Sequence, residues 1–240
     1  YDNLSCIANR STFEIPKNIM QKIEYFCKTN KISIFNFIMS VYSIYISRVS
    51  NLKDFVIGTP ILNRSNFAEK NTMGMFISTI PLRINMENKN TFVDLASSLA
   101  SDTMSAFRHQ KYPYEYILKD LRAKYPNLPS LYNILISYQI TKTTTQSIDH
   151  TVNWAFNGYC ADELQIHIFD LNDTGTLNVS YDYKTQKYTS KDIELIHKRI
   201  LHIINQILHN NTILLIRLVH FTPIRIYRKL EFAYILIHLQ

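Results

Sequence analysis

Residues 109–118 read HQKYPYEYIL and place a histidine, a glutamine and a glutamate around a proline that stands between two tyrosines. A histidine titrates near neutral pH and is the commonest general base, so His109 is a candidate for acid–base chemistry. Such chemistry needs a nucleophile or a second base, and the sequence has no GxSxG segment. The block is therefore either an active-site segment completed by distant residues or a structural joint.

The other histidines do not predict a metal site. His202 and His209 lie two turns apart on an expected helix, whereas metal-binding pairs usually stand at i, i+4 beside a carboxylate, as in HExxH. We expect these two and His197 to be solvated or at the rim of the core. His167 lies on an expected strand, where it either faces a cleft or, as we favour, is half-exposed.

Composition excludes several classes of protein. The chain has 240 residues with a formal charge of +7, and its basic residues are scattered, which argues against a nucleic-acid partner and suits an acidic protein partner. Neither GxGxxG nor GxxxxGK[ST] occurs. The three cysteines are widely spaced and without CxxC, which favours a reducing cytoplasm. No signal peptide is visible, and the abrupt start suggests a piece of a longer chain.

Two further blocks combine unusual residues. In VIGTPILNR (56–64), Gly58 and Pro60 predict a turn that is followed by Arg64. In MGMFISTIPLR (73–83), Gly74 predicts a second tight turn.

After that second turn, Ser78 and Thr79 place hydroxyls on an expected strand that leads to Arg83. Arg64 and Arg83 are both flanked by apolar sequence without a local carboxylate. We therefore expect each arginine to have a partner distant in the sequence.

Hydrophobic periodicity and capping residues predict the elements that position these blocks. Helices are expected at 16–29, at 34–49 after Ser33, from Thr91, which forms a capping box with Asp94, at 118–125, and from Thr189, which forms one with Asp192. Strands are expected at 55–61, at 75–86 with Pro81 implying an edge or a break, at 133–140, and as a hairpin of 164–171 with 176–183, while 141–151 reads as a loop. This order predicts an α/β fold, a layered sandwich with a mixed β-sheet flanked by helices.

Residues 211–240 differ in kind because basic residues interrupt apolar runs without a helix or strand period. Two interpretations remain: a basic segment at a membrane surface, or an edge element or divergent tail. The discontinuous apolar face favours the second, so we expect residues 1–210 to form the domain and 211–240 a divergent tail.

Taken together and in this order, the three blocks resemble the condensation domain of nonribosomal peptide synthetases. VIGTPILNR looks like the family's strand ending in arginine, MGMFISTIPLR is similar to G-x-F-x-N-T-x-x-x-R with Ser78 in place of asparagine, and HQKYPYEYIL is close to H-Q-x-Y-P-F-E with Tyr114 in place of phenylalanine. The resemblance covers about residues 10–210. The family's catalytic HHxxxDG is absent, so the chain resembles only the C-terminal half.

The resemblance implies a chloramphenicol-acetyltransferase-like half-domain that contributes to amide formation between thioesters. The substrates would be carried on phosphopantetheine arms of peptidyl or acyl carrier proteins, with no cofactor bound to this chain. Its first partner would be the missing N-terminal half of the domain, whose HHxxxDG histidine would act on the amine, so that no catalytic residue lies in this chain.

The resemblance also assigns residue roles. Arg64 would support the active site by pairing with the aspartate of HHxxxDG, while Ser78, Thr79 and Ser137 would line the tunnel. The family's structural positions match this chain at Gly58, Pro60, Gly74, Arg83, His109, Gln110, Tyr112, Pro113 and Glu115. In this interpretation His109 belongs to a joint, with Pro113 opening the next helix, Tyr114 packing inward and Glu115 in its first turn.

Two alternatives stay open. The chain is half of an epimerisation domain or a related acyltransferase, or it is a degenerate carrier-binding fragment without chemistry. Function is decided by a site and not by a fold, so the absent histidine pair makes the fragment a serious alternative to the preferred half-domain.

Overall fold

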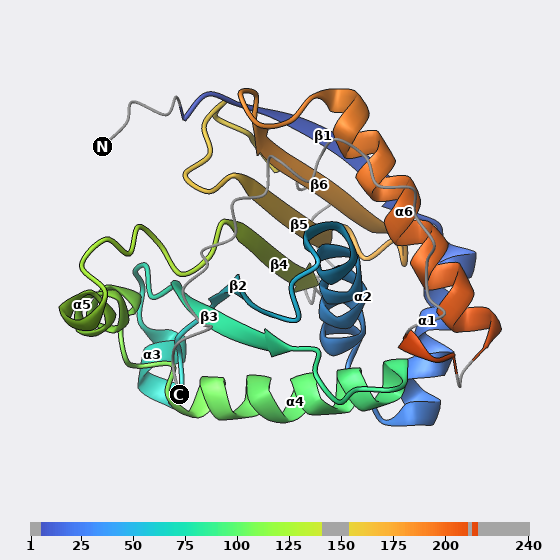
Figure 1. Ribbon diagram of the computed structural model, residues 1–240, viewed down its shortest axis with the longest axis horizontal. Helices are drawn as coiled ribbons and strands as arrows, with labels where there is room; N and C mark the ends of the chain where they lie inside the picture. Colours follow the sequence, from blue (N-terminus) through green and yellow to red (C-terminus); the bar gives the residue numbers. More distant parts are fainter. Residues whose placement is uncertain (1–5, 141–153, 211–212, 216–240) are drawn as a thin grey trace.

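A six-stranded sheet forms the centre of the computed structural model, which describes residues 6–140, 154–210 and 213–215 (Figure 1). The strands are β1 (Ala8–Ile15), β2 (Asp54–Ile61), β3 (Ser78–Asn85), β4 (Ile134–Ile140), β5 (Leu164–Asp170) and β6 (Leu177–Lys184). The helices are α1 (Lys17–Asn30), α2 (Ile34–Ser50), α3 (Phe67–Asn71), α4 (Phe92–Arg108), α5 (Tyr114–Lys124) and α6 (Ser190–His209).

The sheet is mixed, in the order β1-β6-β5-β4-β2-β3. The central pairs β2/β4 and β4/β5 are parallel, while β1/β6, β5/β6 and β2/β3 are antiparallel. The predicted α/β sandwich with a mixed sheet is therefore confirmed. Pro81 lies on β3, which is an edge strand, as its missing N–H requires.

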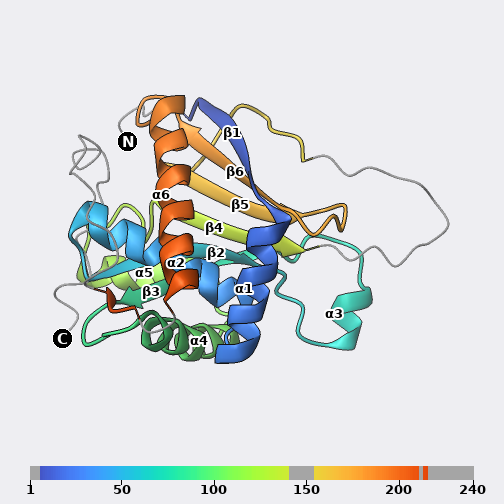
Figure 2. The same cartoon turned by 90° about the vertical axis from the view of Figure 1, so that its right-hand side faces the viewer.

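Helices cover the two faces of the sheet unequally. The main core joins α1, α2, α4 and α6 to one face, and α2 is buried on nearly every side. The sequence dictates this because α2 is apolar all round, and Ser33 starts it by accepting a hydrogen bond from the Asn36 N–H. A smaller cluster packs α5 against Val56 on the opposite face. Figure 2 shows α1, α2 and α6 in front of the strands.

Local signals located the helix ends well. Both predicted capping boxes, at Thr91 and at Thr189, are present. His109 is the C-cap of α4, and Pro113 is the N-cap of α5, with Glu115 in its first turn. The block 109–118 is thus the joint between two helices. Tyr114 is half-buried and packs on the small cluster, as predicted.

Two predictions about the strands are wrong, and two elements were missed. Gly58 and Pro60 do not form a turn, because both lie inside β2, opposite Pro81 and Thr79 of β3. The strand expected at 75–86 begins only at Ser78. The strand β1 and the short helix α3 were not predicted, since neither has a strong apolar period of its own.

Two histidines are buried, contrary to the prediction. His197 is 4% exposed, and a hydrogen bond of 3.1 Å joins its Nδ1 to the Tyr181 hydroxyl. It lies on α6 between Ile196 and Ile200, on the face that packs on the sheet. His167 is also buried.

The loop expected at 141–151 lies outside the described residues, as does most of the predicted tail. Of that tail the structure describes 213–215. Leu215 is buried, and its N–H donates to the Asn90 carbonyl over 2.8 Å. Leu215 therefore packs on the core.

Candidate functional site

A cavity of about 620 Å³ lies at the carboxyl end of β2, between the start of α2 and the side of α4. It joins residues of separate sequence blocks: Pro60 and Arg64 of the first block, Gln110 of the HQ block, and Tyr138 of β4. The carboxyl ends of parallel strands, such as β2 and β4 here, are the usual place for ligand sites in α/β sheets. This cavity is therefore the candidate site.

Its lining is mixed in polarity. Three buried polar residues contribute to it, and each makes a hydrogen bond: Thr59 donates to the Ile136 carbonyl over 2.9 Å, and the Thr103 hydroxyl donates to Asn36 Oδ1 over 3.5 Å. The apolar part of the lining comes from Phe35, Ile61, Leu62, Ala100, Met104 and Phe107.

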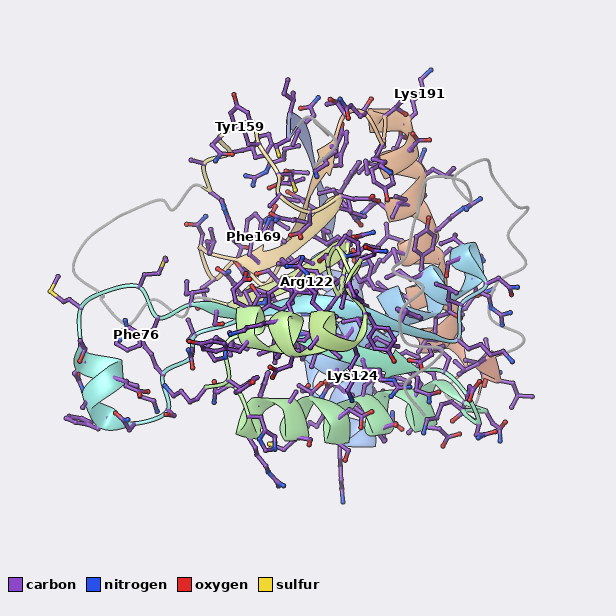
Figure 3. All side chains as sticks on the ribbon, turned by 60° about the vertical axis from the view of Figure 1, so that its left-hand side comes forward. Phe76, Arg122, Lys124, Tyr159, Phe169 and Lys191 are labelled. Carbon is purple, nitrogen blue, oxygen red and sulfur yellow. The ribbon has the colours of Figure 1, made fainter. Side chains whose placement is uncertain are left out.

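Arg64 pairs with no carboxylate among the described residues, and its predicted pairing with an aspartate of the other half stays a prediction. Its guanidinium donates to the backbone carbonyls of Glu69, Thr72 and Gly74, the last two over 2.7 Å each. The same group lies 4.1 Å from the centre of the Phe76 ring. Arg64 thus holds the segment 62–77 in shape, and Figure 3 shows Phe76 beside α3 within that segment.

A second cation ties this segment to the α4–α5 joint. Lys111 Nζ binds the Asn63 carbonyl over 2.9 Å and Glu69 Oε1 over 2.8 Å. The hydrogen bond from Lys111, helped by the Ser65 N–H, lowers the pKa of Glu69 to about 2. The lysine of the HQK block therefore anchors a loop that begins at the cavity.

The segment 62–77 stands away from the sheet, as Figure 2 shows at α3. Five of its apolar side chains are more than half exposed: Leu62, Phe67, Met73, Met75 and Ile77. Gly74, with φ +135°, gives it the bend that the sequence predicted. So many exposed apolar side chains in one segment are unusual for an isolated surface.

Arg83 has the distant partner that was predicted. Its guanidinium donates to both carboxylate oxygens of Asp54 on β2, over 2.5 to 3.2 Å. The arginine side chain is 51% exposed, so this pair lies on the surface away from the cavity.

The three candidate tunnel hydroxyls do not line the cavity. Ser78 is half-buried at the start of β3, and Thr79 hydrogen-bonds the Tyr132 side chain. Ser137 is buried on the sheet face opposite α2, beside His167 in the neighbouring strand.

That opposite face carries an ion-pair cluster that the sequence did not predict. Arg10 Nε and Nη2 bind Asp182 over 2.6 and 2.8 Å, and His167 Nε2 lies 3.3 Å from the same carboxylate. Burial by itself raises the pKa of Asp182, but the hydrogen bonds from Arg10 and His167 outweigh it and lower the pKa. Trp154 packs on the His167 ring at 4.7 Å. The ion pair joins β1 to β6 and has a structural role.

The described residues offer few other reactive groups. They contain no cluster of three or more His, Cys, Asp or Glu that could hold a metal ion. Burial raises the pKa of both Cys27 and Cys160 to about 12, so neither is a thiolate at neutral pH. Across the same residues, no single helix has both the length and the apolar character needed to cross a membrane.

Comparison with known proteins decides the family. The sequence matches the condensation domain family over residues 3–218, which is most of the chain. The chain belongs to the condensation domain family.

This condensation-domain chain is 33% identical over 195 residues to surfactin synthase subunit 1 of Bacillus subtilis (strain 168), covering 81% of the chain and 5% of that protein. The fold matches the condensation domain from the Monacolin K polyketide synthase MokA, with a TM-score of 0.77 at 18% identity over 87% of this chain and 48% of that one. It also matches the first condensation domain of the CDA synthetase, with a TM-score of 0.72 at 13% identity over 90% of this chain and 48% of that one. The chain thus spans about half of each solved domain and a small part of the synthetase.

Proposed function

We propose that this chain is the C-terminal half of a nonribosomal peptide synthetase condensation domain and works only together with an N-terminal half that carries HHxxxDG. The observation that carries the proposal is length: the family match fills this chain, while the chain fills 48% of the solved domains. The absence of HHxxxDG from the sequence agrees with it.

The reaction would be amide formation between two thioesters. An acyl or peptidyl group and an aminoacyl group, each on the phosphopantetheine arm of a carrier protein, would meet between the two halves. The amine would attack the thioester carbonyl with its proton taken or oriented by the histidine of the other half. This chain would form one side of the active-site tunnel and would support the catalytic loop of the other half. The reaction would take place in the cytoplasm.

The segment 62–77 supports this arrangement. Its exposed apolar side chains need a covering surface, and the missing half is the occupant that the length of the relatives suggests. Arg64 fixes the shape of this segment through three carbonyl groups. We propose that Arg64 also carries the family's pairing with the aspartate of HHxxxDG, since its Nε–H has no hydrogen-bond acceptor among the described residues.

The roles of Ser78, Thr79 and Ser137 as tunnel-lining residues remain part of the proposal. Ser78 lies next to the segment 62–77, so a half that covers this segment would also approach Ser78. Ser137 would be reached only from the face that holds Arg10 and Asp182.

The test joins this chain to an HHxxxDG-bearing half from a condensation domain and measures peptide formation with carrier-loaded substrates. Arg64→Ala should lower the rate about tenfold or more, because both the loop and the aspartate pairing are lost. Arg83→Ala is the matched control, since its partner Asp54 lies on the surface. Equal rates and equal melting temperatures for Arg64→Ala and the parent domain would remove this role from Arg64.

A further inference from the structure

Two of the cysteines, Cys6 and Cys160, meet in the fold at the start of β1. Their neighbours Ile7 and Tyr159 form an antiparallel bridge. Beside this bridge the Cys160 N–H donates to the Cys6 carbonyl over 3.0 Å. In an antiparallel pair the residues next to a bridge again stand opposite each other, so Cys6 and Cys160 are directly opposite. The sequence could not show this meeting, because the two cysteines stand far apart along the chain.

The side chains of the two cysteines share one face of the bridge. Side chains alternate along a strand and match across it, so those of Ile7 and Tyr159 share the other face. Exposure agrees with this, because Ile7 and Tyr159 are 57% and 63% exposed, and Tyr159 points away from the molecule in Figure 3. Cys160 instead is 3% exposed, and its thiol donates to the Asp182 carbonyl over 3.8 Å. The exposed Cys6 therefore lies at the rim of the face that buries Cys160.

The spacing of such a pair suits a disulfide. Directly opposite residues whose backbones are hydrogen-bonded have Cα atoms about 5.5 Å apart, and disulfides usually join Cα atoms about 4.4–6.8 Å apart. The Cβ atoms of opposite residues are about 4.5–5.5 Å apart, and a disulfide needs about 3.5–4.5 Å. An approach of at most about 1 Å therefore brings Cys6 and Cys160, which are both thiols in the structure, within bonding range.

The two thiols differ in access to solvent and in acidity. Cys6 is exposed, so a dissolved oxidant reaches it first. Burial raises the pKa of Cys160 to about 12, and the carboxylates of Asp162 and Asp182 act in the same direction, so its thiol is protonated at neutral pH. Redox-sensing cysteines are solvent-accessible and often stand next to a second cysteine that resolves the first oxidation product. Cys6 and Cys160 have these two positions.

We propose that Cys6 and Cys160 form a reversible disulfide that fastens the segment 154–160 to the start of β1 under oxidising conditions. The oxidant is a low-molecular-weight disulfide such as oxidised glutathione. The Cys6 thiolate attacks one sulfur atom of that disulfide and releases one glutathione thiol. Cys160, after losing its proton, attacks Cys6 in the mixed disulfide and releases the second glutathione. The two protons of the protein thiols end on the two glutathione molecules, so one disulfide is reduced as the other forms.

The disulfide adds to contacts that already hold this segment on β1. The Arg10 guanidinium donates to the Trp154 carbonyl over 2.9 Å and lies 4.8 Å from the centre of the Phe156 ring. A covalent link between positions far apart along the chain restricts the unfolded state, so the oxidised chain should be more stable than the reduced chain. Both thiols belong to this chain, so the bond does not depend on the proposed function.

The experiment incubates the full chain with oxidised glutathione and compares it with the chain kept in a reducing agent. Peptide mass spectrometry without reduction should find one pair of peptides joined through Cys6 and Cys160, with two hydrogen atoms lost. The melting temperature should rise by at least about 5 °C, and a reducing agent should reverse the shift.

Two results would overturn the proposal. In the first, Cys160 remains a thiol while Cys6 carries glutathione or links two copies of the chain. In the second, the bond between Cys6 and Cys160 forms but leaves the melting temperature unchanged, so that it does not fasten the segment.

Cysteine variants separate this pair from the third thiol. Cys6→Ser, at an exposed position, should abolish both the joined peptides and the rise in melting temperature. Cys27→Ala removes a thiol that is buried on α1 in the main core and should leave both results intact. If Cys27→Ala does not fold, Cys6→Ser decides, because a rise in melting temperature that persists in this variant would refute the disulfide as its cause.

Discussion

At the scale of single residues, Gly58 is required for the fit of one aromatic ring against the sheet. A Cβ at this position would lie 2.5 Å from the Tyr132 ring, which is closer than packed carbon atoms approach. Gly58 lies inside β2 and not in a turn, so close packing explains why a glycine is needed here. Tyr132 in turn holds the small cluster under α5.

Gly58→Ala should therefore lower the free energy of unfolding by about 1–3 kcal/mol, as overpacking does. In a Tyr132→Ala background the same substitution should cost much less, because the clashing ring is gone. Urea unfolding of the four proteins in this cycle measures the coupling. An equal cost in both backgrounds would show that the Tyr132 ring is not the reason for the glycine.

The buried pair of Arg10 and Asp182 gives a second prediction at this scale. The side chains are 15% and 6% exposed, and Arg10→Met would leave the carboxylate without its main partner. Unfolding free energy should fall by about 3–5 kcal/mol. The double variant Arg10→Met/Asp182→Leu should regain most of this unfolding free energy, because neither charge of the pair is then left buried.

The exposed pair of Arg83 and Asp54 is the control for that experiment. Arg83→Met should cost less than about 1 kcal/mol, since solvent screens the pair. A similar loss for the two arginine variants would contradict the account of Arg10 as a buried structural cation.

At the scale of elements, α6 and β6 are joined through a buried polar chain. The Tyr181 hydroxyl bonds the Tyr42 hydroxyl over 2.9 Å and His197 Nδ1 over 3.1 Å. Phe13 of β1 stacks on the His197 ring at 4.5 Å. Burial lowers the pKa of His197 from 6.5 to about 4, so the imidazole is neutral at pH 7.

Stability should therefore depend on pH through this residue. Between about pH 6.5 and 4 the unfolded chain binds a proton at His197 that the folded chain does not. The contribution is fully present above pH 6.5 and is lost as the pH falls to about 4, by about 3 kcal/mol. His197→Gln should flatten this part of the pH profile of unfolding, and His202→Gln, at an exposed position on the same helix, should not. If the pH profiles of unfolding for His197→Gln and the parent run parallel, the assigned role of His197 is contradicted.

At the scale of the whole molecule, features that depend on neighbours in sequence were predictable and features that depend on distant contacts were not. Thr91 and Thr189 cap their helices through residues three positions on, so both helix starts were visible in the sequence. The mixed sheet followed from the order of elements. The reason for Gly58 is its contact with Tyr132, which is far away in sequence. The sequence pattern therefore wrongly predicted a turn there.

The candidate site shows the same limit. Arg64 and Gln110 were singled out as motif residues, and both line the cavity. The acceptors for Arg64 are carbonyls of a loop whose path no periodicity reveals. Asn36 is a polar residue in the apolar run IFNFIM, and its partner Thr103 lies far away in sequence, so that contact was not predictable. His197 stands among isoleucines at helical spacing, which was the available sign of its burial.

The central claim is that this chain is half of a catalytic domain, and one assay tests it most directly. Peptide formation is measured with carrier-loaded donor and acceptor for the chain alone, for the chain joined to an HHxxxDG half, and for the joined protein with the second histidine changed to alanine. We predict product only from the joined protein with both histidines intact, because in the proposed function the base that acts on the amine would lie outside this chain. Turnover by the chain alone, or no turnover by a folded joined domain, would contradict the account.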